Sequence, residues 1–117
     1  MLSEKRIAGN FAEDKACSFL KKKGFRIIRR NYASRAGEID IIAADGEELC
    51  FVEVKSSSGG FLPPELKVNK TKQRKIIKMA SLFMEREGQA FNAFRFDVIA
   101  FDRGEVRHYR NAFTADR

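Results

Sequence analysis

Two spacings of apolar residues divide this chain into helices and strands. Apolar residues recur every three or four positions over about 3–23 and again over about 69–87, which predicts two amphipathic helices. Gly24 and Gly88 follow these segments and are placed to end them. Alternating or continuous apolar runs predict five strands, at 25–30, 38–44, 49–55, 94–101 and 105–110.

Turn residues join these strands into hairpins. Asp45-Gly46 separates the second predicted strand from the third, and the last two are joined through Asp102 to Gly104. A run of Ser, Gly and Pro at 56–64 predicts a mobile loop. The resulting order, α-β-β-β-α-β-β, predicts an α/β fold in which one domain, residues 1–117, has a central mixed sheet flanked by helices.

The apolar stripe of the first helix predicts its packed face. Glu13 lies along the edge of this stripe, so its carboxylate is expected in a partly buried setting. The stripe comprises Ile7, Phe11, Ala12, Ala16, Phe19 and Leu20.

Composition narrows the class of protein. With 117 residues, 44% of them hydrophobic, the chain can build a core without disulfides or metal. Cys17 and Cys50 lie among apolar neighbours and are predicted to be reduced core residues, as expected in the cytoplasm. No apolar run approaches the roughly 20 residues that span a bilayer, and residues 1–10 resemble no secretory signal. We therefore expect no membrane insertion and no export.

The charges are unevenly distributed. The chain carries a net charge of +7, which favours a polyanionic partner such as a nucleic acid. Residues 1–37 hold ten basic and three acidic side chains, whereas residues 38–60 hold one basic and six acidic side chains. This distribution suits a basic surface that binds a phosphate backbone beside carboxylates that hold a cation.

The acidic segment, residues 38–60, contains the main candidates for catalysis and metal binding. Because side chains alternate along a strand, Glu38 and Asp40 share one face of the second predicted strand, and Glu53 and Lys55 share one face of the third. The facing pairs depend on the hairpin register, and two registers remain open. In one, Asp40 lies opposite Glu53; in the other, shifted by two residues, Glu38 lies opposite Glu53 and Asp40 is diagonal to it.

Two interpretations of this cluster are compatible with the residues. Carboxylates on directly opposed residues can bind one ion between them, and oxygen-only ligands favour Mg²⁺ or Mn²⁺. Alternatively, the face is solvated and crossed by salt bridges, Glu38 to Lys55 in particular. The apolar residues at 39, 41, 42, 50–52 and 54 favour the first interpretation, because they predict a central, covered hairpin in which unpaired carboxylates are costly.

Several motifs together resemble the YraN-like family of small bacterial proteins. They are GEIDIIA at 37–43, FVEVK at 51–55, RFDVIAF at 95–101, the terminal Asn111-Ala112-Phe113, and the Gly9, Glu13 and Ala16 pattern of the first helix. The family in turn resembles the PD-(D/E)XK nucleases, close in plan to archaeal Holliday-junction resolvases. This resemblance implies a restriction-endonuclease-like fold and metal-dependent hydrolysis of DNA phosphodiester bonds.

The resemblance also implies a role for each acidic position. Asp40 is similar to the first metal-binding aspartate of the superfamily, Glu53 to its second acidic ligand, Lys55 to the lysine that ends the motif, and Glu13 to the helix-one glutamate of the resolvase-like branch. Together with the backbone carbonyl of Val54, the three carboxylates are the expected Mg²⁺ or Mn²⁺ ligands. Lys55 is expected to orient the attacking water or to offset transition-state charge.

The chain departs from the superfamily pattern at two positions. Ile39 stands where the superfamily's name has proline, and Ser57 stands where relatives often have arginine.

Other polar residues are candidates for contacts with nucleic acid. The predicted set is Arg30, Arg35, Lys70, Lys72 and Gln73. For the three residues that begin the second helix, two alternatives stay open: hydrogen bonds to the metal-site carboxylates, or an ordinary solvated face. Phe61, in the loop at 56–64, is a candidate stacking side chain.

Two further polar residues are predicted to be structural. The only histidine, His108, is interpreted as a polar residue of an edge strand, and Asp97 is expected to pair with a neighbouring arginine. No histidine general base is predicted.

Three classes of function are compatible with these residues. The chain is a metal-dependent nuclease acting on DNA, for example on branched or repair intermediates; a nucleic-acid-binding module that needs a partner protein for activity; or an interaction domain whose acids are structural. The intact set of Asp40, Glu53 and Lys55 favours the first over the third. Resolvase-like action by so small a protein requires a homodimer, whereas a monomer favours single strands or ends.

Overall fold

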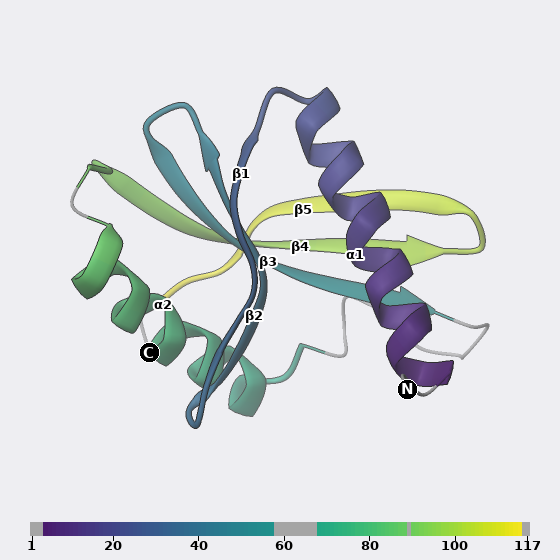
Figure 1. The fold of residues 1–117 in the computed structure, drawn as a ribbon, viewed down its shortest axis with the longest axis horizontal. Coiled ribbons are helices and arrows are strands. Elements are labelled where there is room, and N and C mark those ends of the chain that lie inside the picture. Colours follow the sequence, from purple (N-terminus) through teal and green to yellow (C-terminus); the bar gives the residue numbers. More distant parts are fainter. Residues whose placement is uncertain (1–3, 58–67, 89, 116–117) are drawn as a thin grey trace.

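A computed structural model describes residues 4–57, 68–88 and 90–115, with side chains described for 11–56, 68–88 and 90–115 (Figure 1). Its elements follow the predicted order and are α1 (Glu4–Lys22), β1 (Arg26–Ser34), β2 (Gly37–Asp45), β3 (Glu48–Ser57), α2 (Lys70–Glu87), β4 (Ala93–Asp102) and β5 (Glu105–Phe113). Of the loop predicted at 56–64, Ser56 and Ser57 instead continue β3, because this strand stays paired with β4 as far as Ser57↔Asp102. The remainder of that loop, including Phe61, lies outside the described residues.

All five strands form one mixed sheet in the order β1-β2-β3-β4-β5. The pairs β1–β2, β2–β3 and β4–β5 are antiparallel, and β3 pairs with β4 in parallel. Parallel neighbours need a long crossover connection, and the segment that contains α2 supplies it. The predicted mixed sheet is confirmed, with β3 at its centre.

Each face of the sheet is covered by one helix (Figure 1). Met79, Ala80 and Phe83 of α2 pack on one face, against residues of β2, β3 and β4. Ala16, Cys17 and Leu20 of α1 pack on the other face. Residues at the centre of the sheet are therefore buried on both sides, which explains the nearly continuous apolar runs of these strands. Cys17 and Cys50 are buried and free, as predicted.

The first and last strands are longer than predicted. Residues 29–34, predicted mainly as a basic connection, belong to β1, which pairs with β2 as far as Ser34↔Gly37. The last strand, β5, continues to Phe113 rather than ending at 110. Both are edge strands, where polar side chains face solvent and hide the strand pattern that burial would otherwise give.

Phe11 does not belong to the packed stripe of α1. Its side chain is 62% exposed, whereas Ala16 and Leu20 of the same predicted stripe are fully buried. Among the described side chains of α1, those buried against the sheet, Ala16, Cys17 and Leu20, lie nearer the C-terminus of the helix than Phe11, which helical spacing alone had placed with them. The side chain of Ile7 lies outside the described residues.

His108 lies on an edge strand, as predicted, and its side chain is only 3% exposed. Its ring makes edge contacts with Phe19 and Phe25. Nδ1 lies 2.9 Å from Nζ of Lys23 and Nε2 lies 2.8 Å from Oδ2 of Asp97. Because an ammonium group can only donate, Nδ1 accepts and Nε2–H donates to Asp97.

None of the helices in the described ranges 4–57, 68–88 and 90–115 is long and apolar enough to cross a membrane.

Candidate functional site

The hairpin of β2 and β3 adopts one of the two predicted registers. Its paired residues run from Asp45↔Glu48, across a two-residue turn, to Ile41↔Val52, and include Ala44↔Leu49. Continuing this register places Asp40 opposite Glu53. The pairing ends just before these two carboxylates, so both lie where the strands separate.

At this point the side-chain carboxylate of Asp40 accepts the hydrogen bond that a backbone carbonyl would accept in a regular strand pair. Its Oδ2 accepts a hydrogen bond of 2.8 Å from the N–H of Val54, on the neighbouring strand. A charge-assisted bond of this kind fixes the carboxylate to β3. Ile39 packs in the core beneath α2 and Ile41 in the core beneath α1, so strict alternation of side chains breaks at Asp40.

The carboxylates of Asp40 and Glu53 form a repulsive pair, in which Asp40 is partly buried. Glu53 is 3% exposed. Burial raises the pKa of Asp40, and the neighbouring charge of Glu53 raises it further, to about 8, although the N–H of Val54 opposes the shift. A carboxyl group is perturbed this strongly at sites that bind a cation or perform catalysis.

Two lysines compensate the charge of Glu53. Nζ of Lys55 lies 3.4 Å and Nζ of Lys72 lies 2.5 Å from Oε2 of Glu53. Burial and the neighbouring ammonium of Lys72 lower the pKa of Lys55, more than Glu53 raises it. For Lys72, burial acts in the same direction, but the hydrogen bond to Glu53 and the other interactions outweigh it and raise the pKa.

A cavity of about 430 Å³ opens between the start of β2 and the start of α2. Gly37 is essential to its shape: its φ of +149° is unfavourable for other residues, and an added Cβ would lie 3.3 Å from Cβ of Lys75. The helix begins at the cavity because the Asn69 side chain accepts a hydrogen bond from the N–H of Lys72. The lining residues are Gly37, Glu38, Asp40, Glu53, Asn69, Thr71, Lys72, Lys75 and Ile76.

Glu13 approaches the site from α1. It is 9% exposed, as its position at the edge of the helical stripe predicted, and its Oε1 is buried without a hydrogen-bond partner. Nη2 of Arg30 lies 3.8 Å from Oε1, but the same group lies only 2.7 Å from Asp14. Burial raises the pKa of Glu13, against the opposing charge of Arg30. Its own charge contributes to the raised pKa of Asp40.

A family model described as uncharacterised protein family UPF0102 matches residues 12–101 of this chain. The chain belongs to this family. The UPF0102 protein of Persephonella marina is 41% identical over 111 residues, which cover 94% of this chain and 96% of the relative. That of Geobacter sulfurreducens is 42% identical over 114 residues, covering 92% and 89%. That of Thermotoga neapolitana is 54% identical over 77 residues, covering 66% and 71%.

The carboxylates of this UPF0102 chain suit a hard divalent cation only as a pair. Among the described residues, no group of three or more His, Cys, Asp or Glu side chains is placed to hold a metal ion. Asp40 and Glu53 nevertheless supply the oxygen donors that Mg²⁺ prefers, and Mg²⁺ typically keeps several waters beside one or two carboxylates. A cation between them would also relieve the repulsion that raises the pKa of Asp40. The pair therefore fits Mg²⁺, and the buried, unpartnered Oε1 of Glu13 lies nearby.

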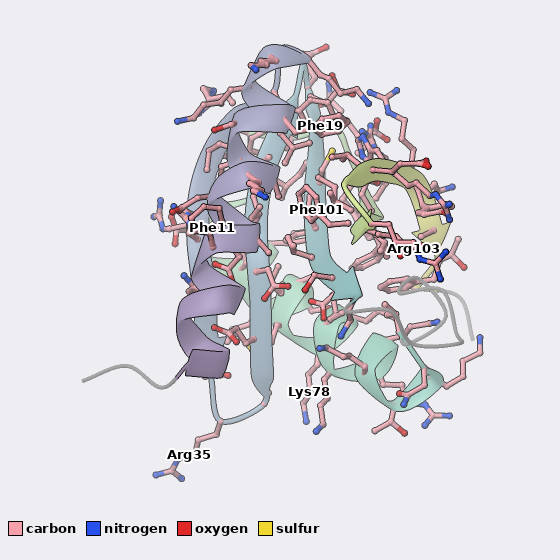
Figure 2. All side chains as sticks on the ribbon, turned by 90° about the vertical axis from the view of Figure 1, so that its right-hand side faces the viewer. Phe11, Phe19, Arg35, Lys78, Phe101 and Arg103 are labelled. Carbon is pink, nitrogen blue, oxygen red and sulfur yellow. The ribbon has the colours of Figure 1, made fainter. Side chains whose placement is uncertain are left out.

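The predicted nucleic-acid contacts of the UPF0102 chain fall into two groups. Arg35 and Lys70 are exposed, and Figure 2 shows Arg35 projecting from the turn between β1 and β2. Arg30, Lys72 and Gln73 make contacts within the protein: with Asp14, with Glu53, and from Nε2 of Gln73 to the carbonyl of Val68 at 3.0 Å, respectively. For Lys72, contact with the metal-site carboxylates was one of the predicted alternatives.

Gly37 and Lys75 belong to the site although no sequence pattern predicted them there. Helical spacing contained a signal for the lysine, because Lys72, Lys75 and Ile76 share one face of α2 and Ile76 is a core residue. Only the fold brings this face to the start of β2.

Replacing Lys72 by Gln is expected to destabilise the metal-free protein by about 1–2 kcal/mol, because the buried Glu53 loses its closest cation. Urea unfolding in EDTA measures this free energy. Lys75→Gln is the matched control, since Lys75 lines the same cavity from the same helix; we expect a change within about 0.5 kcal/mol. Equal effects of the two substitutions would contradict the assignment of Lys72 to Glu53.

Proposed function

We propose that this protein is a Mg²⁺-dependent nuclease that hydrolyses phosphodiester bonds of DNA, with branched or repair intermediates as the substrate class. One observation carries the proposal: the partly buried carboxylate of Asp40 and the buried carboxylate of Glu53 are held opposite each other in an open cavity, with Lys55 beside them. Two like charges are unfavourable in this position unless a cation binds them. The resemblance to PD-(D/E)XK nucleases supports the same conclusion.

Asp40 and Glu53 would hold the ion, and Glu13 would reach its shell through water. The bound ion supplies polarisation of a phosphate oxygen and a lower pKa for a coordinated water. The hydrogen bond from Val54 keeps the Asp40 carboxylate in one orientation. The contribution of Val54 is thus its N–H, in addition to the carbonyl that the sequence suggested.

Lys55 is the residue that acts on the substrate. Its lowered pKa brings its proton closer to exchange near neutral pH than that of an exposed lysine. Placed 3.4 Å from Glu53, its ammonium can orient the attacking water or stabilise the charge that develops on the phosphate.

Lys72 acts as a replaceable counter-ion. Its Nζ bonds to the same Oε2 atom of Glu53 that faces Lys55. When a divalent cation binds, this ammonium is free to turn from Glu53 toward a substrate phosphate, because the side chain is partly exposed.

The surface around the cavity supports a nucleic acid as the substrate. Lys75 lines the cavity, and Lys70, Arg74 and Lys78 follow one another at intervals of four residues along α2. These three residues line a neighbouring pocket on another face of the same helix. A row of cations on the helix that borders the cavity is suited to a phosphate backbone, and the net charge of +7 favours the same partner.

The proposal is tested by titrating Mg²⁺ and Mn²⁺ into the protein by calorimetry, with and without a short branched DNA, and running the same samples on a cleavage gel. Metal binding together with metal-dependent cutting supports the nuclease. The alternative is a non-catalytic nucleic-acid-binding module, which is favoured by the compensation of Glu53 by two lysines without a metal. DNA binding with strong salt dependence, but without metal binding or cutting, would establish this alternative.

Replacing Lys55 by Gln distinguishes the residues that bind the metal from the residue that accelerates cleavage. We expect metal binding to persist, because both carboxylates remain, and the cleavage rate to fall about 100-fold through loss of transition-state stabilisation. Calorimetry and single-turnover cleavage measure the two quantities. Unchanged cleavage would exclude Lys55 from the reaction.

A further inference from the structure

A groove of about 570 Å³ lies between α1 and the β4–β5 hairpin. Figure 2 faces this surface, with Phe11 and Phe19 on α1 and Phe101 on β4. Val106 of β5 completes its apolar lining, and both Phe11 and Val106 are exposed. Large side chains exposed together in one concave patch are typical of a binding surface.

The border of the groove is cationic. Lys15, Lys22 and Arg103 line it, and Nζ of Lys15 lies 5.1 Å from the centre of the Phe11 ring. The acidic side chain in the lining, Asp14, is bound to Arg30 at 2.7 Å. Arg103 also lies 3.9 Å from Oδ1 of Asp102, through its Nε. The groove therefore combines an aromatic surface with a border rich in positive charge, to which Lys15 and Lys22 contribute.

The groove lies near the carboxylate pair. Ser56, which lines it, is three residues beyond Glu53 on β3, a distance of about 10 Å along the strand. On α1, Asp14 of the groove directly follows Glu13. The cavity opens on the side of the sheet covered by α2 and the groove on the side covered by α1, so a nucleic-acid strand that occupies both passes around the end of β3.

We infer that this groove binds unpaired nucleotides of a DNA strand, with a base stacked on Phe11 and the adjoining phosphates near Lys15 and Arg103. The inference rests on the proposed action on nucleic acid and specifies its substrate as DNA with a single-stranded segment. Aromatic side chains stack on bases irrespective of sequence, and neighbouring cations follow the backbone.

The cationic border and the exposed ring of Phe11 favour unpaired nucleotides over two other occupants, a second copy of the chain and a continuous duplex. A second copy of the chain would bring another net charge of +7 to a cationic surface, which opposes association. A continuous duplex offers phosphates to the lysines but keeps its base faces stacked inside the helix. Only an unpaired nucleotide can stack its base on Phe11 while its phosphates contact the cations.

The test measures binding by fluorescence anisotropy in EDTA, so that neither metal nor cleavage is required. The probes are a labelled deoxythymidine oligonucleotide of about 12 nucleotides, a duplex of equal length, and a strand of equal length with abasic sites. Phe11→Ala is compared with Phe94→Ala, because Phe94 is also exposed but contacts Phe51 and Phe96 beneath α2. Circular dichroism verifies that both variants are folded.

Phe11→Ala is expected to weaken binding of the single strand about tenfold and to leave duplex binding within about twofold. Phe94→Ala should change neither, and the effect of Phe11→Ala should disappear on the abasic strand. Unchanged binding of the single strand, an equal loss on the duplex, or an undiminished loss on the abasic strand would each overturn the inference. The inference would also be overturned if Phe11→Ala changed the oligomeric state in sedimentation but did not weaken single-strand binding.

The same samples, supplied with Mg²⁺, distinguish this inference from the proposed nuclease. Phe11-dependent binding without cleavage by the wild type would refute the nuclease and leave the groove assignment intact. Cleavage by the wild type that proceeds equally well in Phe11→Ala would support the nuclease and contradict the groove assignment.

Discussion

Replacing Asp40 by Asn is expected to stabilise the metal-free protein by about 1 kcal/mol while reducing metal-dependent cleavage about a thousandfold. The Asn oxygen can still accept from the N–H of Val54, and the amide can donate to Glu53. The substitution therefore removes the cost of either protonating Asp40 below its pKa of about 8 or placing its charge opposite Glu53 above that pH. The same change removes one of the two proposed metal ligands. Opposite effects on stability and activity are expected where a protein maintains an unfavourable charge pair for function.

Urea unfolding with EDTA and with Mg²⁺ measures the first effect, and cleavage of a branched DNA measures the second. At a Mg²⁺ concentration 100 times its Kd, the wild type should gain about 2.7 kcal/mol of stability, and Asp40→Asn should gain little. Glu38→Gln is the control, because Glu38 lines the same cavity from the same strand but is exposed. Destabilisation of the metal-free protein by Asp40→Asn would identify Asp40 as a structural residue and contradict the proposal.

Replacing Asp97 by Asn is expected to destabilise the protein by about 3 kcal/mol or more. Asp97 is completely buried, and its carboxylate accepts from Nε of Arg95 at 3.0 Å, Nε2 of His108 at 2.8 Å and the N–H of Asn111 at 3.0 Å. The substitution leaves the buried guanidinium of Arg95 without this carboxylate. Urea unfolding at neutral pH measures the loss, and Asp102→Asn, at the partly exposed end of β4, is the control with an expected change below about 1 kcal/mol.

The contribution of Asp97 should also depend on pH. Burial alone would raise the pKa of Asp97, but the hydrogen bonds from His108, Arg95 and Asn111 outweigh it and hold the pKa below the ordinary value of 3.8. A lowered carboxyl pKa stabilises the folded state above the unfolded pKa, and this stabilisation is lost as the pH falls through the folded pKa. Below about pH 4, the unfolding free energy should therefore fall more steeply with acid for the wild type than for Asp97→Asn. Parallel curves would show that Asp97 does not control acid unfolding.

The hairpin of β2 and β3 illustrates how far sequence patterns reach. Alternation and the Asp45-Gly46 turn predicted both strands, but left two registers open. The structure has Ala44 opposite Leu49 and Asp45 opposite Glu48, which is the register that places Asp40 opposite Glu53. Strict alternation failed at Asp40, where a side chain replaces a backbone acceptor; a hydrogen bond of this kind has no period and leaves no pattern in the sequence.

Phe11 and His108 show that sequence patterns also do not determine which side chains are buried. Helical spacing placed Phe11 on a packed stripe, and the polar edge strand that contains His108 gave no indication that its side chain is enclosed. Burial depends on which part of a neighbouring element lies above each residue, so Phe11 is exposed and His108 is enclosed by Phe19 and Phe25 of the segment around α1.

The sequence by itself determined the order of the elements, the mixed sheet, the two buried cysteines and the carboxylates that share the hairpin, because these depend on local periodicity and on the chemistry of each residue type. The predicted pairing of Asp97 with a neighbouring arginine, Arg95, is confirmed. Only the tertiary structure decided that Lys72 neutralises Glu53, that Gly37 admits α2 to the site, and that His108 of the next strand joins the Asp97–Arg95 pair. These contacts join residues distant in the chain. Their partners are selected by the packing of the helices on the sheet, which no local pattern encodes.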